Sequence, residues 1–159
     1  MMAAIESATP SRRVLAIASG GGHWIQLQRL RPAFADFDVA YVSVYADYAE
    51  DVSGERFYLV TDATRNNVFK LLVLIPQFIR ILAREKPDVV ITTGSAPGLV
   101  GLAVAKAFTR ARTVWIDSIA NCERVSTSGM QARFVADEWL TQWPELASAK
   151  GPKYWGAVL

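Results

Sequence analysis

Short runs of apolar residues alternate along the chain with longer segments whose apolar residues recur at helical spacing. The runs are short and continuous, and most are bounded by glycine, proline or polar clusters, as buried strands of a parallel sheet are. They predict strands at 14–18, 39–44, 57–60, 89–92, 113–117 and 138–141, with a last short piece at 154–158. Strands that alternate with helices predict a parallel sheet covered on both faces.

The segments between these runs predict the helices. Apolar residues recur at helical spacing from Trp24 to Phe34. A long apolar segment follows later, and Pro76 is expected to kink it or divide it in two. Helices are therefore expected at 24–34, 68–85 and 99–108, with a loop and short helix at 118–134. The predicted fold class is α/β, a Rossmann-like open parallel sheet with helices on both faces. It forms a single domain at 13–159 after a disordered lead-in at 1–12.

Composition is that of one ordinary globular domain. Hydrophobic residues make up 52% and charged residues 20% of the 159 residues, and the net charge is +2. This small charge argues against a nucleic-acid-binding protein. The single cysteine, Cys122, excludes an internal disulfide and is expected to be a small packing residue in a reducing cytoplasm.

The most apolar stretch, Val68 to Leu82, is shorter than the ~20 apolar residues that a membrane-spanning helix needs. It predicts a core helix or a helix that lies on a membrane surface. The two interpretations stay open at this level, because a surface helix requires Lys70, Arg80 and Arg84 to share a face.

Three loops follow predicted strands and have compositions that suit anions. In an open parallel sheet, ligands bind beyond the carboxyl ends of the strands, and a following helix N-terminus favours phosphate. The alternative is that each loop is only a tight strand-to-helix turn. The candidate substrate- and phosphate-binding residues are Ser19, Gly20, Gly21 and Gly22 in the first loop, Thr93, Gly94, Ser95 and Gly98 in the second, and Asp117 and Ser118 in the third.

His23 is the only histidine and the candidate catalytic residue. Imidazole suits proton transfer near neutral pH, and a helix N-terminus favours its neutral form, which can accept a proton. His23 could equally cap the helix or orient a ligand. The polar loop 64–67 could meet an acidic group or be solvated.

Several familiar sites are absent from the sequence. The first loop lacks the third glycine of the dinucleotide fingerprint, since Ile25 stands there, and no P-loop motif occurs. No cluster of residues suggests a metal site. We therefore expect neither a cofactor nor a metal.

The ordered motifs "SGGGHWIQL", "TRNN", "KPDVVITTGSAPGLVGLAVAK", "VWIDS", "TQWPEL" and "YWGAV" resemble an oligosaccharide-biosynthesis family. Its eukaryotic member is the anchoring subunit of a two-subunit UDP-N-acetylglucosamine transferase that extends a dolichyl-diphosphate sugar. Its bacterial members are small subunits of capsule and exopolysaccharide glycosyltransferases. The glycine–histidine loop is also similar to that of the peptidoglycan GlcNAc transferase.

The resemblance implies the N-terminal, acceptor-binding half of a GT-B glycosyltransferase that is split between two chains. It implies a partner subunit that holds most of the UDP-sugar, a lipid-linked sugar acceptor, and a place at the inner face of the cytoplasmic membrane. The family usually has Glu-Ser and a nearby arginine after the fifth strand, whereas this chain has Asp117-Ser118 with Arg124 further on. The alternatives are a membrane recruiter without catalytic function and a stand-alone nucleotide-binding module.

Overall fold

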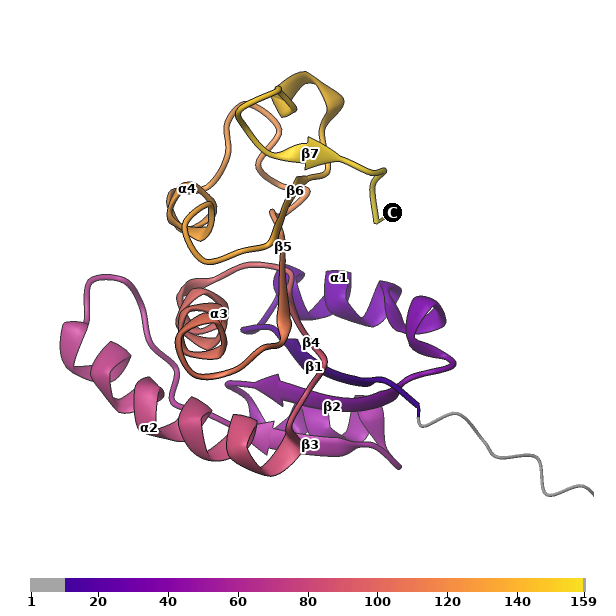
Figure 1. Ribbon diagram of the computed structural model, residues 1–159, viewed down its shortest axis with the longest axis vertical. Coiled ribbons are helices and arrows are strands. Elements are labelled where there is room, and N and C mark those ends of the chain that lie inside the picture. The colour runs from indigo at the N-terminus through magenta and orange to yellow at the C-terminus, as the bar shows by residue number, and fades with distance from the viewer. Residues whose placement is uncertain (1–10, 159) are drawn as a thin grey trace, which may run out of the picture.

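A seven-stranded parallel sheet runs through residues 11–158, the part of the chain that the computed structural model describes (Figure 1). The strand order is β3-β2-β1-β4-β5-β6-β7, which confirms the predicted Rossmann-like α/β class. Residues 1–10, which include most of the predicted lead-in, lie outside the described residues. The strands are β1 (Arg13–Ile17), β2 (Asp38–Ser43), β3 (Arg56–Leu59), β4 (Val89–Thr92), β5 (Arg112–Ile116), β6 (Glu138–Thr141) and β7 (Lys153–Tyr154).

Helices cover both faces of the sheet. Strand side chains alternate between the faces, so Val14 and Ala16 of β1 pack with α1, whereas Leu15 and Ile17 pack with the helices opposite. Figure 1 shows α1 alone on one side and α2, α3 and α4 on the other. The helices are α1 (Gly22–Arg29), α2 (Val68–Glu85), α3 (Ala96–Phe108) and α4 (Thr127–Ala132), with 3₁₀ turns at Arg31–Phe34, Ala46–Val52 and Pro144–Leu146.

The long helix α2 is continuous, so the predicted division at Pro76 does not occur. The Asn67 side chain caps its start by accepting the N–H of Lys70 at 3.0 Å, and Lys86 ends it in a left-handed conformation. Pro76 lies on the exposed side of the helix. Water can satisfy the carbonyl that loses its partner there, which is why the helix tolerates the proline.

Helix α3 packs closely against the sheet at Gly101. A Cβ atom placed on Gly101 would lie 2.5 Å from Cδ1 of Ile17 and 3.0 Å from Cε1 of Phe78. Only a residue without a side chain fits between β1 and α2 at this point. Gly101 therefore sets how closely α3 can approach the sheet.

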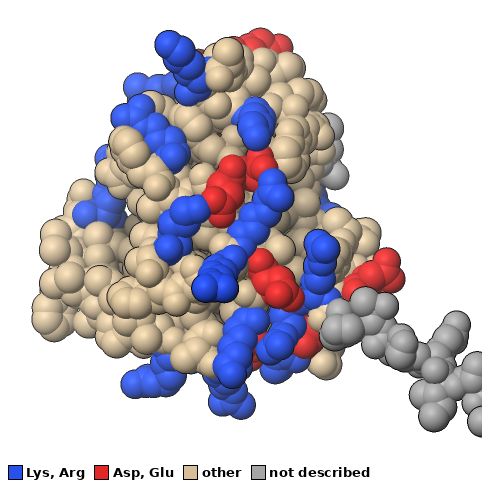
Figure 2. Space-filling model, in the orientation of Figure 1, with Lys and Arg blue, Asp and Glu red and all other residues tan. Residues whose placement is uncertain are grey.

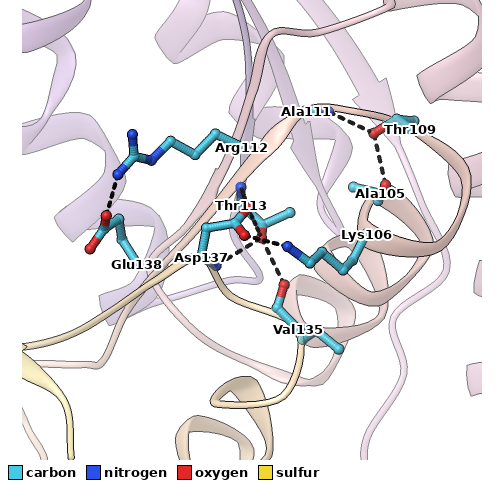
Figure 3. Close-up of polar contacts among 9 residues, drawn as sticks. All are labelled: Ala105, Lys106, Thr109, Ala111, Arg112, Thr113, Val135, Asp137 and Glu138. Carbon is cyan, nitrogen blue, oxygen red and sulfur yellow. Dashed lines mark hydrogen bonds and ion pairs between the residues drawn. The ribbon is translucent and has the colours of Figure 1, made fainter.

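At the amino edge of the sheet, ion pairs join the start of β6 to helix α3 and to β5 (Figure 3). The Asp137 carboxylate pairs with Lys106 and accepts the N–H of Thr113 at 2.9 Å. Burial acts to raise the pKa of Asp137, but the hydrogen bonds from Lys106 and Thr113 outweigh burial and hold this pKa below its ordinary value. Hydrogen bonds from Lys153 and Arg112 likewise lower the pKa of Glu138.

We expect Asp137→Asn to destabilise the fold in a pH-dependent way. A carboxyl whose pKa is lowered by folding stabilises the native state above its unfolded pKa, and this stabilisation is lost as the pH falls through the folded pKa. Because Asp137 is partly exposed, the loss at pH 7 should be below about 1 kcal/mol, or roughly 2–4 °C in Tm. Thermal unfolding should show that the difference in Tm between wild type and Asp137→Asn becomes smaller as the pH falls below about 4.

The matched control is Asp36→Asn, because Asp36 is exposed and its carboxylate has no partner among the described residues. This control should leave the Tm unchanged. A Tm gap for Asp137→Asn that is the same at pH 3 and pH 7 would contradict the electrostatic account.

Candidate functional site

The two glycine loops lie side by side at the carboxyl edge of the sheet. Strands β1 and β4 are neighbours in the sheet, but the chain runs outward from them in opposite directions. This point, where the strand order reverses, is where open parallel sheets bind ligands. The loop after β1 leads into α1, and the loop after β4 leads into α3. Neither helix has an acidic residue in its first turn, so both N-termini keep their partial positive charge.

His23 joins the two loops through a pair of hydrogen bonds. Its Nδ1 lies 2.8 Å from the carbonyl oxygen of Thr93, and the Thr93 hydroxyl donates to the carbonyl of His23 at 2.7 Å. A carbonyl oxygen can only accept a hydrogen bond, so Nδ1 must carry the proton. The neutral ring then has Nε2 unprotonated and available to accept a proton.

Gly94 makes the close contact between the loops possible. It has a φ of 122°, and a Cβ atom there would lie 2.7 Å from Cε1 and 2.8 Å from Nδ1 of His23. Ser95, which follows, also has a positive φ of 82° while its hydroxyl caps α3 at Gly98. A serine with this backbone conformation is strained, and such strain is concentrated at functional sites.

The other glycines of the two loops have different surroundings. A Cβ atom on Gly20 would lie 2.1 Å from the Tyr45 ring, and one on Gly98 would lie 2.2 Å from Oγ1 of Thr92. Gly21 donates its N–H to the Tyr48 hydroxyl at 3.1 Å. The close packing of Gly20 and Gly98 is a structural role, whereas ligand binding by these glycines stays a prediction.

A cleft crosses the carboxyl edge in front of these loops. It consists of two adjoining cavities of about 310 Å³ and 280 Å³, which share Arg65, Ser95 and Ser128. Hydroxyl groups dominate its walls. The larger cavity is lined by His23, Arg65, Ser95, Ser118, Ala120, Asn121, Ser126, Thr127 and Ser128, and the smaller by Ser19, Asp62, Ala63, Thr64, Arg65, Ser95, Ala96, Pro97 and Ser128.

A larger cavity, of about 580 Å³, lies at the opposite edge of the sheet. It is lined by the ends of α2 and α3, including Leu82, Pro87 and Phe108. We place the candidate site at the carboxyl edge instead. There the loops after parallel strands converge and His23 is found, whereas the other cavity is mostly apolar.

Asp117 supports the site from within. The side chain is only 1% exposed, and its carboxylate accepts hydrogen bonds from Trp115, Asn121 and Ser126. It thereby holds the loop after β5 and the start of α4. Asp117 is not among the residues that line the cleft, and its carboxylate is occupied by these internal donors; ligand contact by Asp117 stays a prediction.

Ser118, in contrast, reaches the wall of the larger of the two cleft cavities. Its hydroxyl accepts a hydrogen bond from Gln26 of α1 at 3.0 Å. The Gln26 side chain also accepts from the backbone of Ile119 at 3.1 Å and from Gln142 at 2.6 Å. This buried network fixes the position of the loop after β5 relative to α1.

The family to which the chain belongs follows from its sequence. Residues 55–158 match the model of the family described as "Oligosaccharide biosynthesis protein Alg14 like". The chain is a member of this family. It is also 25% identical to the UDP-N-acetylglucosamine transferase subunit ALG14 of Eremothecium gossypii, over 94% of this chain and 81% of that protein. The matched residues of the Alg14-like family include the second and third loops but not the glycine–histidine loop.

Solved structures share the fold of this Alg14-like chain. MurG from Acinetobacter baumannii superposes with a TM-score of 0.74 at 16% identity, covering 90% of this chain and 45% of MurG. The UDP-GlcNAc 2-epimerase from Methanocaldococcus jannaschii gives 0.61 at 14% identity, covering 81% and 39%. The chain thus spans less than half the length of these proteins, and at these identities the likeness shows the fold alone.

Three residues of the cleft have no site role in the sequence analysis. The loop that carries Arg65 could meet an acidic group or be solvated, and nothing in the sequence singles out Ser126 and Ser128 at the start of α4. The sequence feature that could have pointed to Arg65 is its position in a polar turn between the end of a strand and the start of a helix. Cys122, expected to be packed, is exposed, because its loop lies on the surface.

Two kinds of feature are absent from residues 11–158. No group of three or more metal-binding side chains occurs there, and the metal-free reaction stays a prediction. No helix in this part of the chain is both long and apolar enough to span a membrane.

We expect Gly94→Ala to displace the His23 ring. Because His23 is the only histidine, ¹⁵N-labelled histidine should give one ring signal set in NMR spectra. At alkaline pH the wild-type ring should be protonated at Nδ1 only. In Gly94→Ala, the added methyl group should break the contact with Thr93 and produce a mixture of tautomers.

Gly22→Ala is the matched control, since a Cβ atom there would meet nothing closer than 3.9 Å. It should keep the wild-type tautomer. A wild-type ring protonated at Nε2 would contradict the hydrogen bond between Nδ1 and Thr93.

Proposed function

We propose that this chain is the acceptor-binding subunit of a split glycosyltransferase. It would transfer a sugar, with inversion, from a UDP-sugar to a polyprenyl-diphosphate-linked saccharide in polysaccharide biosynthesis. Family membership supports a role in oligosaccharide biosynthesis. The observation that carries the proposal is His23, held between the two glycine loops with Nδ1 on the Thr93 carbonyl, so that Nε2 is the ring nitrogen left to accept a proton.

In this mechanism, Nε2 of His23 takes the proton of the acceptor hydroxyl. The hydroxyl oxygen forms a bond to C1 of the donor sugar from the face opposite UDP. The bond between C1 and the diphosphate oxygen breaks, and its electron pair leaves with UDP. The N-termini of α1 and α3 would stabilise the developing negative charge. No step needs a metal ion or cofactor.

A second subunit would close the cleft. One Rossmann-like domain cannot enclose both a sugar nucleotide and a lipid-linked acceptor, and glycosyl transfer requires water to be excluded. This chain covers 45% of MurG, which is consistent with one half of a two-domain enzyme. We propose that the partner supplies the C-terminal GT-B half and holds most of the UDP-sugar.

We expect His23→Ala to lower kcat of the two-subunit complex by about 10²–10⁴-fold, because a general base contributes a factor of this size. KM for the acceptor should change little. Steady-state kinetics of the complex with each substrate varied in turn would measure both parameters.

Added imidazole should partly restore the rate of His23→Ala, since it can enter the space that the ring leaves. Turnover of His23→Ala at the wild-type rate would contradict the role of His23 as the base.

The exposed side of α2 supports a proposal of membrane contact at the inner face of the cytoplasmic membrane. Val68, Phe69 and Leu72 are all more than half exposed, with Phe69 at 76%. Figure 2 shows that the surface over α2 is largely uncharged and that Lys and Arg lie at its borders. An apolar strip with basic borders suits the surface of an anionic bilayer.

We expect the double variant Phe69→Ser/Leu72→Ser to bind vesicles of phosphatidylglycerol and phosphatidylcholine at least about tenfold more weakly than wild type. Each side chain contributes about 1.5–3 kcal/mol when it moves from water into an apolar phase. Co-sedimentation with the vesicles would measure this.

Ile25→Ser is the control, because Ile25 is 55% exposed on α1, on the other face of the sheet. Equal binding by the double variant and the control would contradict contact through α2.

The same exposed face favours a second candidate function, a membrane recruiter for a partner that is catalytically complete. The two functions differ in what the partner can do alone. A partner that transfers sugar to a detergent-solubilised acceptor at the full rate, without this chain, would favour the recruiter.

A further inference from the structure

We propose that Arg65 binds the diphosphate of the lipid-linked acceptor and so fixes the direction in which the acceptor lies in the cleft. The inference rests on the proposed transferase function. It adds a specificity-determining residue and an order of subsites along the cleft.

Arg65 is held at the tip of a closed turn. The turn runs from Thr64 to Asn67, and the N–H of Asn67 donates to the carbonyl of Thr64 at 3.0 Å. Asn67 also caps α2 through Lys70, so the turn is attached to the start of a long helix. Arg65 therefore extends from an anchored backbone even though its side chain is exposed.

The guanidinium group is free to bind a ligand. Among the described residues, Arg65 makes no ion pair and its side chain makes no hydrogen bond. Asp62 lines the same smaller cavity without pairing with it. A guanidinium group presents donors in a planar fork that matches two phosphate oxygens.

Arg65 lies where the two cavities meet. Of the two cleft cavities, it lines the larger together with His23 and the smaller together with Ser19. Neither cavity has another arginine or a lysine in its wall. Hydroxyl groups of Ser95 and Ser128, which line both cavities, can donate to the same anion.

The surroundings of Arg65 give the cleft a direction. His23 lies toward one end, and the exposed apolar residues Val68 and Phe69 of α2 begin three residues after Arg65. An acceptor consists of a sugar, a diphosphate and an apolar chain in this same order. The sugar would reach His23, the diphosphate would lie on Arg65, and the chain would follow α2 toward the membrane.

A diphosphate could also come from the nucleotide donor, so two measurements are needed. The first is independent of transferase activity and measures binding of inorganic pyrophosphate to the isolated chain by calorimetry. We expect Arg65→Gln to weaken binding about 10- to 100-fold, the range for loss of a charged hydrogen-bonding group. Arg65→Lys should weaken it less, because the charge remains.

Arg12→Gln is the matched control, since Arg12 is exposed and precedes β1 at the amino edge. It should bind pyrophosphate as wild type does. Wild-type affinity in Arg65→Gln, or no saturable binding by the wild-type chain, would overturn the proposal whether or not the chain proves to be a transferase subunit.

The second measurement uses the two-subunit complex with a polyprenyl-diphosphate-sugar acceptor. We expect Arg65→Gln to raise KM for the acceptor at least about tenfold, with kcat and KM for the UDP-sugar nearly unchanged. A rise in KM for the UDP-sugar alone would assign Arg65 to the donor and overturn the acceptor assignment. Absence of transfer by the wild-type complex would count against the proposed function and leave the pyrophosphate result to stand on its own.

Discussion

Two hydrogen bonds between His23 and Thr93 join segments that are 70 residues apart in the chain. They connect the start of α1 with the loop after β4, across the point where the strand order of the sheet reverses. Gly94 permits the contact because no other residue leaves room for the imidazole ring. The position of the ring, its tautomer and one wall of the cleft all depend on this contact. A change in either loop is therefore expected to act on both.

The fold could be predicted from the sequence because its determinants are local. Apolar runs specify buried strands, and parallel strands bring their carboxyl ends to one edge, so the two glycine loops had to lie near each other. Helix α2 shows the limit of local rules. A proline in a helix interior predicts a break, but Pro76 lies on the solvent side, where the lost hydrogen bond costs least.

The site could be predicted only in part, because side-chain direction depends on packing between distant segments. Composition placed Asp117 and Ser118 in one candidate loop, yet the structure buries the Asp117 carboxylate and leaves Ser118 in the cavity wall. One of the donors that decide this is Ser126, the N-cap residue of α4, which reaches Asp117 only when α4 packs against the sheet. Arg65 enters the cleft for a similar reason, since the turn that carries it is positioned by α2.

This chain supplies His23 and one wall of the cleft. The most direct test of the proposed role of His23 is a structure of the chain in complex with its partner subunit, a polyprenyl-diphosphate-sugar and UDP. We expect the acceptor hydroxyl to lie within about 3.2 Å of Nε2 of His23, or one water away, with the acceptor diphosphate on Arg65. An acceptor bound entirely within the partner, with His23 facing solvent, would contradict this role.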